Sequence, residues 1–180
     1  LDERKFAQKA GLGVIGAHGC VISQKLGSFF HIGYIMTNIH PENLSAFIPA
    51  KPPETQGCSG CGKCARVCPG DALGSRTPIF DYKRCVSYLT QCKGELKEGE
   101  KRIMGDWVFG CDLCQNACPM NRGKYLGTID NAEETRPKLS DLLNLTNAGF
   151  KARFAGTAAG WRGKKILQRN AAIVLENLRA

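Results

Sequence analysis

The sequence predicts an α+β chain made of three successive parts. Glycine-punctuated, β-prone residues fill much of the N-terminal part, nine of the ten cysteines lie between residues 58 and 119, and the hydrophobic pattern turns helical after Pro137. These observations predict a strand-forming part, a cysteine-rich module and a helical part. We place their boundaries at residues 1–57, 58–122 and 123–180, with an insertion inside the module at residues 75–107.

The N-terminal part begins with a helix predicted over residues 3–10. Two short strands are expected next, one within Val14–Ser23 and one within Gly27–Ile39, joined by the turn between them. Four of the eight prolines fall in residues 41–57, which are therefore expected to form a connecting loop.

The C-terminal part follows a polar connector over residues 120–136 and is expected to consist of helices. In the last of these helices, apolar side chains recur at the helical period. This spacing predicts one buried face, made of Ile166, Leu167, Ile173, Val174 and Leu178.

The composition is that of a globular chain long enough to bury a core, with 180 residues, 43% of them hydrophobic and 23% charged. It has no run of about 18 apolar residues and no export signal, so we expect neither a membrane span nor secretion, and a cytoplasmic location. Because the chain opens with Leu1 and not with Met, we expect further residues before it.

The formal net charge of +9 favours an anionic partner such as nucleic acid, although a basic chain can equally owe its charge to solubility. Near the C-terminus, a group of basic residues beside a tryptophan could bind phosphates or form a solvated helix face. This group is Trp161, Arg162, Lys164, Lys165 and Arg169.

The first cysteine run has the spacing found in bacterial ferredoxins, Cys-x2-Cys-x2-Cys-x3-Cys-Pro, which binds [4Fe–4S] clusters through thiolates. It consists of Cys58, Cys61, Cys64 and Cys68, followed by Pro69. Three closely spaced thiolates can ligate three irons of one cubane from a single loop. The fourth cysteine points away and ligates the other cluster of a two-cluster module.

A second run repeats the last three positions at Cys111, Cys114 and Cys118, but it has Val108 in the first position. One ligand must therefore come from the insertion, which offers Cys85 and Cys92. We favour Cys85, which lies between a charged turn and an apolar stretch, and Cys92 stays open as the alternative. The predicted ligands are Cys58, Cys61, Cys64 and Cys118 for cluster 1, and Cys68, Cys85, Cys111 and Cys114 for cluster 2.

Other interpretations of the cysteines are weaker. A zinc ribbon made of two Cys-x2-Cys pairs would leave Cys64, Cys68, Cys85 and Cys118 without a role. A disulfide framework is typical of exported chains. Cys20 and Cys92 are expected to be small buried hydrophobic residues. Two clusters in one small module imply one-electron relay as the minimal activity.

Gly11, Gly13 and Gly16 match the dinucleotide-binding pattern G-x-G-x-x-G, but a helix precedes them, β-prone residues follow, and no acidic residue lies about 20 positions on. We expect these glycines to permit a tight bend of the backbone or its close approach to a flat ligand. The three histidines, His18, His31 and His40, are expected at surface or core positions and not at a metal.

Several stretches, in their order along the chain, resemble one known family. They are the residues from Glu3 to Gly16, those from Gly27 to Thr37, both cysteine runs, the insertion CVSYLTQCKGEL and the C-terminal RGKKILQRNAAIVLEN. The family is that of the epoxyqueuosine reductases, cobalamin-dependent iron–sulfur enzymes of tRNA queuosine synthesis. The cysteine runs occur in many ferredoxin-like proteins, whereas the displaced ligand followed by VSYLT and the AGLG stretch are more specific.

The resemblance implies a bacterial 2[4Fe–4S] ferredoxin-like module, preceded by part of an α/β cobalamin-binding region and followed by C-terminal helices that contact tRNA. It implies that an unidentified low-potential donor supplies electrons, which pass through two [4Fe–4S] clusters to cobalamin. The reduced cofactor then converts epoxyqueuosine in the tRNA anticodon loop to queuosine. We expect a monomer that does not associate with membranes.

Carried over position by position, the resemblance implies the eight ligands named above, with Cys85 preferred to Cys92. It places Val21, the Gly27–Gly33 stretch, Ser87 and Asp112 against cobalamin. In the insertion it places Lys93 near RNA.

The sequence also departs from the family pattern. The family's proton donor, the Asp of an Asp-(Ser/Thr)-Ala-Pro segment, would precede Glu3, so no catalytic residue is predicted in this chain. Met120 stands where Trp is common and Ala17 where Lys is usual. The chain is thus either a fragment or a relative with a changed substrate. Two other functions remain open: a stand-alone ferredoxin-like electron carrier, and a cobalamin-dependent reductase of another substrate.

Overall fold

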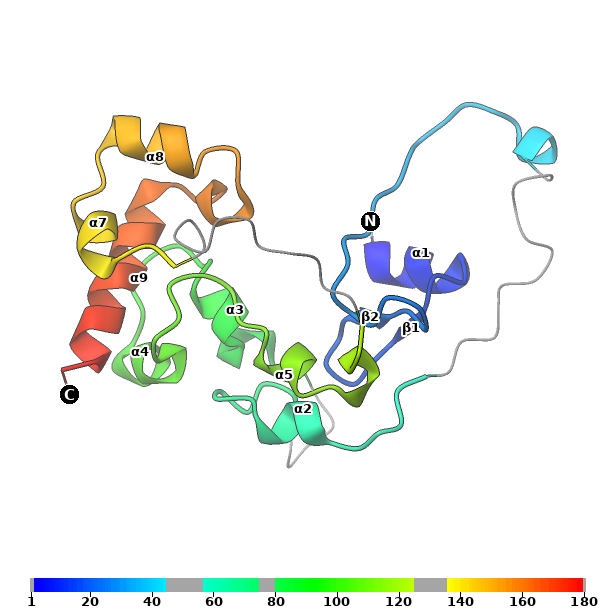
Figure 1. Ribbon diagram of the computed structural model, residues 1–180, viewed down its shortest axis with the longest axis horizontal. Helices are drawn as coiled ribbons and strands as arrows, with labels where there is room; N and C mark the ends of the chain where they lie inside the picture. Colours follow the sequence, from blue (N-terminus) through cyan, green and yellow to red (C-terminus); the bar gives the residue numbers. More distant parts are fainter. Residues whose placement is uncertain (1, 45–56, 75–79, 125–135, 180) are drawn as a thin grey trace. The chain divides into compact units, whose positions relative to one another are not determined.

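A computed structural model of the protein describes residues 2–44, 57–74, 80–124 and 136–179. The chain folds as two compact units (Figure 1). Unit 1 consists of Leu1–Cys64 and Gln115–Leu126, and unit 2 of Ala65–Cys114 and Gly127–Ala180. Helices dominate the described residues, and a two-stranded sheet accompanies them, so the predicted α+β class is confirmed.

Unit 1 begins with a helix and a small hairpin, as Figure 1 shows in blue. The helix α1 (Glu3–Lys9) is capped by Asp2, whose side chain accepts a hydrogen bond from the Lys5 N–H. The strands β1 (Val14–Ile15) and β2 (Val21–Ile22) pair antiparallel, and α1 packs against both. The predicted N-terminal helix is confirmed.

The strand predicted within Gly27–Ile39 is wrong. After an isolated bridge between Ser23 and Gly27, the chain continues to Ile39 without a strand. A strand needs a neighbour for its N–H and C=O groups, and beyond the bridge at Gly27 none of the described segments pairs with this one. Its side chains are correspondingly exposed, Ile35 by 93% and Met36 by 87%. Both observed strands lie instead within Val14–Ser23, on either side of a glycine-containing turn.

The predicted loop and connector are only partly described. The loop over residues 41–57 starts with the 3-10 turn η1 (Pro41–Leu44), and residues 45–56 lie outside the described residues. Residues 125–135 of the connector and 75–79 of the insertion also lie outside them. The three-part division at residues 57 and 122 stays a prediction, because the two compact units are defined by packing and not by function.

Unit 2 contains the helices of the insertion and of the C-terminal part. Those of the insertion are η2 (Tyr82–Arg84), α3 (Val86–Leu89) and α4 (Glu98–Met104). Those of the C-terminal part are α7 (Leu139–Leu143), α8 (Asn147–Arg153), η4 (Ala158–Gly160) and α9 (Lys164–Asn177). None of the described helices is both long enough and apolar enough to span a membrane.

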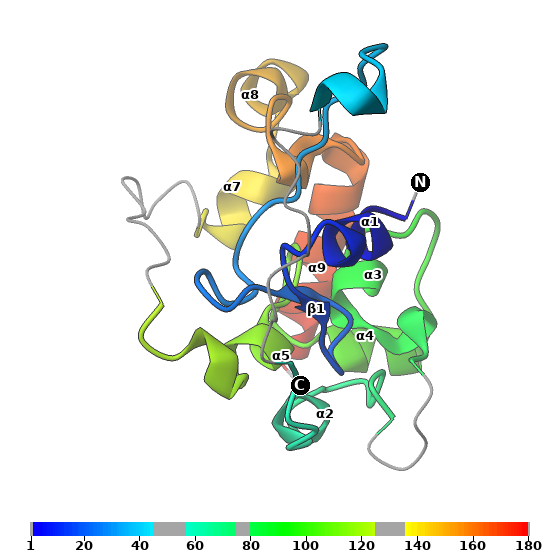
Figure 2. The ribbon, with the colours of Figure 1, turned by 90° about the vertical axis from the view of Figure 1, so that its right-hand side faces the viewer.

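The helix α9 joins the two apolar cores of unit 2. Buried side chains of α3, α4 and α9 form one core, which includes Val86, Met104 and Val174. Side chains of α7, α9 and the segments around α8 form the other, which includes Leu142 and Leu167. Figures 1 and 2 both show α3 and α4 lying alongside α9. The C-terminal helix therefore supports the insertion of the cysteine module.

The buried face predicted for α9 is largely correct. Leu167, Ile173 and Val174 are buried, but Leu178 is 65% exposed because the helix ends at Asn177. The sequence pattern also passed over Asn170, which lies on the same buried face and is fully inaccessible to solvent.

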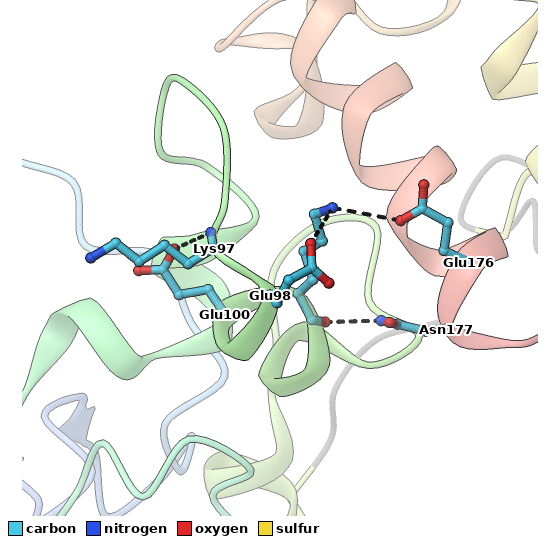
Figure 3. A network of polar contacts seen from close by, with 6 residues as sticks. Lys97, Glu98, Glu100, Glu176 and Asn177 are labelled. Carbon is cyan, nitrogen blue, oxygen red and sulfur yellow. Dashed lines mark hydrogen bonds and ion pairs between the residues drawn. The ribbon is translucent and has the colours of Figure 1, made fainter. Parts of the chain in front are cut away.

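Polar contacts join α4 to the last turn of α9 (Figure 3). The Lys101 ammonium lies 2.9 Å from a Glu98 carboxylate oxygen and 3.7 Å from one of Glu176. The hydrogen bond to Glu98 raises the pKa of Lys101. Exposed ion pairs of this kind add little stability. The firmer contact is that of Asn177, whose amide donates to the Lys101 and Gly105 carbonyls at 2.9 and 2.7 Å.

Candidate iron–sulfur centre

The first cysteine run folds as a tight loop that leads into a short helix. Residues 58–62 have no regular structure, and α2 (Lys63–Arg66) follows. Gly60 and Gly62 have φ angles of +66° and +69°, which glycine adopts without steric cost. Cys58 and Cys61 are exposed on the loop, and Cys64 is buried in the helix. The loop is therefore shaped to present several thiols within a few residues.

The second run repeats this local structure. Gly110, with a φ angle of +68°, precedes Cys111, and α5 (Leu113–Asn116) contains Cys114 as α2 contains Cys64. Each helix ends two residues before a Cys-Pro pair, and the turn η3 (Pro119–Asn121) follows the second pair. Spacing in the sequence thus corresponds to one repeated unit of backbone structure.

The boundary between the compact units falls at the same place in both runs. It lies directly after the cysteine that precedes the last cysteine of the run. Unit 1 ends its first segment at Cys64, and unit 2 ends its first segment at Cys114. The last cysteine of each run thus folds with the opposite unit from the cysteines before it. Unit 1 contains Cys58, Cys61, Cys64 and Cys118 besides Cys20, and unit 2 contains Cys68, Cys85, Cys111 and Cys114 besides Cys92. Each predicted set of four ligands lies within one unit.

Three of the predicted cluster 2 ligands interact electrostatically. Burial raises the pKa of the half-buried Cys111 thiol, and the nearby thiols of Cys85 and Cys68 and the Asp112 carboxylate raise it further. A hydrogen bond from the Leu113 N–H acts in the opposite direction. Thiolates brought together in this way repel one another, and bound iron would offset that repulsion. The residues present therefore fit a cluster.

The loop after Cys68 packs directly on the turn before Cys85. Gly70 is buried, and a Cβ atom at this position would collide with the Arg84 carbonyl. The Arg84 guanidinium in turn donates to the Gly70 carbonyl. The Ala72 N–H donates to the Cys68 sulfur at 3.3 Å. These contacts hold Cys68 and Cys85 in neighbouring segments.

Cys92 has a different environment. Its thiol donates to the Leu89 carbonyl at 3.3 Å, and its side chain packs against the apolar core of α3, α4 and α9. A thiol that donates a hydrogen bond keeps its proton, whereas a ligand must lose it. Cys85 is the N-cap residue of α3, and its side chain makes no capping hydrogen bond to this helix. The surroundings favour Cys85 as the displaced ligand.

Among the described residues, no group of three or more His, Cys, Asp and Glu side chains is gathered so as to hold a single metal ion. A cubane makes a different demand, because each thiolate ligates an iron of its own. His18 is buried and its Nδ1 accepts from the Cys20 N–H at 3.1 Å, while His31 and His40 are exposed.

The glycine pattern near the N-terminus lies in the wrong context for a dinucleotide. The helix α1 precedes it, and β1 lies within it between Gly13 and Gly16, whereas such a site needs a strand before the glycines and a helix after them. A Cβ atom on Gly13 would collide with the Ile22 carbonyl, and one on Gly16 with the Ile22 side chain. Gly13 and Gly16 thus allow a close approach to the β2 segment, while the expected approach to a flat ligand stays a prediction.

Unit 1 contains a cavity of about 300 Å³ beside the β2 strand. Val21, Ser28, Phe30 and His31 line it, together with Arg4, Cys20 and Gln115. Two of the predicted cobalamin contacts thus border the same cavity, namely Val21 and the Gly27–Gly33 stretch. The other two, Ser87 and Asp112, belong to unit 2 and do not line this cavity.

A polar network fixes one wall of the cavity and was not predicted from the sequence. The Ser28 hydroxyl donates to Gln115 Oε1 at 2.8 Å. The backbone N–H of Ser28 donates to Asn121 Oδ1 at 2.6 Å. The Asn121 amide donates to the Ser28 hydroxyl and to the Gln115 carbonyl. The network links the cavity to the turn after Cys118. The Asn in CPMNR is the signal that could have indicated it.

Lys93, the predicted RNA contact, is exposed in the insertion. It lies between Cys92 and Gly94, whose carbonyls both accept from the Arg169 guanidinium. The backbone on both sides of Lys93 is therefore anchored, while its ammonium is accessible.

Comparison with known proteins agrees with this geometry. A family described as a 4Fe-4S double cluster binding domain matches residues 57–121, so the cysteine module is a double-cluster module. The epoxyqueuosine reductase of Bacillus cereus is 36% identical over 183 residues, which cover 99% of this chain and 46% of that protein. The solved epoxyqueuosine reductase of Streptococcus thermophilus matches all of this chain and 46% of its own, with 36% identity and a TM-score of 0.84.

Over nearly its whole length the chain is similar to epoxyqueuosine reductases. The resemblance found in the sequence is thereby confirmed, and the zinc and disulfide interpretations are set aside. The chain spans about half the length of the curated relatives that it matches. A further solved epoxyqueuosine reductase, in complex with a tRNA-Tyr epoxyqueuosine-modified stem loop, matches 99% of this chain with 31% identity and a TM-score of 0.81.

Proposed function

We propose that this chain is the iron–sulfur part of an epoxyqueuosine reductase, in which two [4Fe–4S] clusters relay electrons to cobalamin for the reduction of epoxyqueuosine in tRNA to queuosine. The division of the predicted ligands into two sets of four, one within each compact unit, supports this proposal most directly. Each set takes one cysteine from the opposite run, as a two-cluster ferredoxin module requires.

In the proposed arrangement, cluster 1 is held by Cys58, Cys61, Cys64 and Cys118, and cluster 2 by Cys68, Cys85, Cys111 and Cys114. Bound clusters would supply reversible one-electron storage. The chain's own groups hold the thiolates in place: the Ala72 N–H on Cys68 and the Leu113 N–H on Cys111 stabilise negative sulfur. Such N–H···S bonds favour the more negative, reduced state of a cluster.

For cobalamin, the proposal places the cofactor against the cavity of unit 1. Val21 and the Gly27–Gly33 stretch border that cavity, and Ser87 and Asp112 remain predicted contacts from unit 2. Bound cobalamin would supply the reactive cobalt. Ser28 is held by Asn121 and Gln115, so this wall is fixed before a cofactor arrives. Gly27 has a φ angle of +71°, which allows the backbone to turn directly before Ser28 in this wall of the cavity.

For tRNA, the support is the relative solved with a modified stem loop and the net charge of +9. An RNA anticodon loop is a polyanion with bases that can be splayed out toward a pocket. The exposed Lys93 is a proposed phosphate contact. A tRNA substrate also agrees with the expected cytoplasmic location. We expect the protein to act as a monomer supplied by a low-potential electron donor.

The ligand set is tested by comparing Cys85→Ser with Cys92→Ser. After anaerobic reconstitution, the parent chain should hold about eight irons, as two [4Fe–4S] clusters require. Cys85→Ser should hold about four, and Cys92→Ser should still hold about eight. The opposite pattern would make Cys92 the ligand. Iron and acid-labile sulfide are measured against protein concentration.

The wider function is tested by titrating the reconstituted chain with cobalamin and with a tRNA stem loop. The proposal expects a change in the cobalamin absorption spectrum on binding. It also expects stem-loop affinity that falls steeply as salt rises, because phosphate contacts release counterions. A chain that binds neither ligand is a stand-alone electron carrier. A chain that binds cobalamin but no RNA at low salt is a reductase of another substrate.

A further inference from the structure

Two neighbouring residues of α9 bind the backbone of the insertion. The Arg169 guanidinium donates to the carbonyls of Leu89, Cys92 and Gly94 at 3.0, 2.9 and 2.6 Å. The Asn170 amide donates to the carbonyls of Thr90 and Val108, both at 2.7 Å. Five backbone carbonyls of the cysteine module are thus bound by one dipeptide of the C-terminal helix.

Asn170 is fully buried, and its hydrogen-bonding groups are all used. Its amide nitrogen makes the two bonds to carbonyls, and its Oδ1 accepts from two nitrogens of Arg169, at 3.0 and 2.8 Å. A buried polar group that is completely satisfied specifies one geometry, since any displacement leaves a donor or an acceptor unpaired. The surrounding segments are therefore held in a fixed register.

The segments that Asn170 joins are those that carry two predicted cluster 2 ligands. Thr90 ends the α3 turn that begins at Cys85, and Val108 lies three residues before Cys111. The Thr90 hydroxyl adds a second link, because it accepts from the Gly110 N–H at 3.0 Å and donates to the Ser87 carbonyl at 3.0 Å. A continuous chain of hydrogen bonds leads from Asn170 through Thr90 to the residue next to Cys111.

We propose that Asn170, oriented by Arg169, is a positioning residue for cluster 2. It holds the Cys85 turn and the Cys111 loop at the separation that one cubane requires, although it touches no cysteine itself. Val108 occupies the position of the missing cysteine in the second run. The ligand that replaces it, Cys85, comes from a separate segment, so hydrogen bonds are needed to join that segment to the Cys111 loop. This inference rests on the proposed ligand set of cluster 2.

The chain contains a matched control in Asn177. This residue lies on the same helix and also donates two hydrogen bonds to backbone carbonyls, at 2.9 and 2.7 Å. Its partners, Lys101 and Gly105, belong to α4 and its cap, in a segment without a cysteine (Figure 3). Asn177→Leu therefore removes two bonds to backbone carbonyls from the same helix, as many as Asn170 donates, without touching the Cys85 or Cys111 segments.

The test compares Asn170→Leu and Asn177→Leu in the full chain after anaerobic reconstitution with iron and sulfide. Asn170→Leu should lower the iron content from about eight to about four per chain, and the reduced protein should lose the spin signal of one cluster and the coupling between the two. Asn177→Leu should keep both signals. Equal loss of iron in both variants, or full iron content with an unchanged cluster 2 potential in Asn170→Leu, would overturn the proposal.

A milder variant keeps the test decisive if Asn170→Leu does not fold. Thr90→Val preserves the side-chain shape but removes the acceptor of the Gly110 N–H. It should shift the midpoint potential of one cluster and leave the other unchanged, whereas two unchanged potentials would count against the proposal. A parent chain that holds no iron would refute the proposed function itself. If the parent chain holds about eight irons, the proposed function stands, and the variants test only the positioning role of Asn170.

Discussion

Single glycines determine how closely the ligand-bearing segments approach one another. Gly70 lies two residues after Cys68 and packs against the carbonyl of Arg84, the residue before Cys85. Any side chain at this position would separate the two segments. The contact holds Cys85, the ligand proposed from the insertion, in a segment next to that of Cys68, which spacing in the sequence does not reveal.

We expect Gly70→Ala to damage cluster 2 selectively. The added methyl group collides with backbone, so the segments must shift at a cost of about 1–3 kcal/mol. Iron content should fall toward half of the parent value, measured after anaerobic reconstitution. Gly99→Ala is the matched control, because a Cβ atom there meets nothing within 4 Å. In α4 that change should stabilise the chain by about 0.4–1 kcal/mol and leave the iron content unchanged.

His18 is expected to make unit 1 less stable in mild acid. Burial lowers its pKa below the ordinary value of 6.5, so the folded protein resists protonation more than the unfolded chain does. The full contribution to stability is present above pH 6.5 and is lost as the pH falls below it toward the lowered pKa. Hydrogen exchange of residues 13–23, corrected for intrinsic rates, should show weaker protection at pH 5.5 than at pH 7.5.

The control for this prediction is His18→Asn, which replaces the titratable ring by a neutral side chain. Protection of the same amides should then depend much less on pH over this range. If the parent chain and the variant lose protection to the same extent, another group is responsible for the acid sensitivity.

Residues whose role depends on their own chemistry could be predicted, and residues whose role depends on tertiary partners could not. The cysteines are recognised by type and spacing, and the family match covers both runs. Asn121 and Asn170 have ordinary polar side chains, and only the fold brings them to Ser28 and to the Thr90 carbonyl. The signals available in advance are a polar asparagine inside an apolar helix pattern for Asn170 and the Asn of CPMNR for Asn121.

At the scale of elements, helices were predicted better than strands. A helix closes its hydrogen bonds within one segment, so α1 and α9 could be recognised from local pattern. A strand depends on a neighbour, and the Gly27–Ile39 segment has the composition of a strand without a partner among the described residues. The end of α9 was also placed too late, because apolar Leu178 continues the pattern beyond the last helical residue.

The packing of α7 against α9 leads to a prediction at this scale. Leu142 is 1% exposed between these helices, so Leu142→Ala should lower the free energy of unfolding of unit 2 by about 2–5 kcal/mol. Leu178→Ala, at an exposed position, should change it by less than about 0.5 kcal/mol. Urea denaturation followed by tryptophan fluorescence measures both, since Trp107 and Trp161 belong to unit 2. Equal effects would mean that α7 does not pack as described.

At the scale of the whole molecule, the two runs exchange their last cysteines. Neighbouring cysteines of one run, Cys114 and Cys118, belong to different units, whereas Cys58 and Cys118 belong to the same one although 60 residues separate them. The ferredoxin spacing predicts this exchange, and the sequence alone could not assign the displaced ligand. With the proposed ligand sets, neither cluster is built from one run.

The exchange predicts a pattern of non-additivity in double variants. Cys58→Ser and Cys118→Ser should remove the same cluster, so the double variant should still hold about four irons, as each single variant does. Cys58→Ser with Cys114→Ser should remove both clusters and leave almost no iron, although each single change again leaves about four. If clusters were instead built from single runs, the Cys114 and Cys118 changes would act on one cluster. The Cys58/Cys118 double variant would then hold almost no iron, and iron analysis of the three single and two double variants distinguishes the two arrangements.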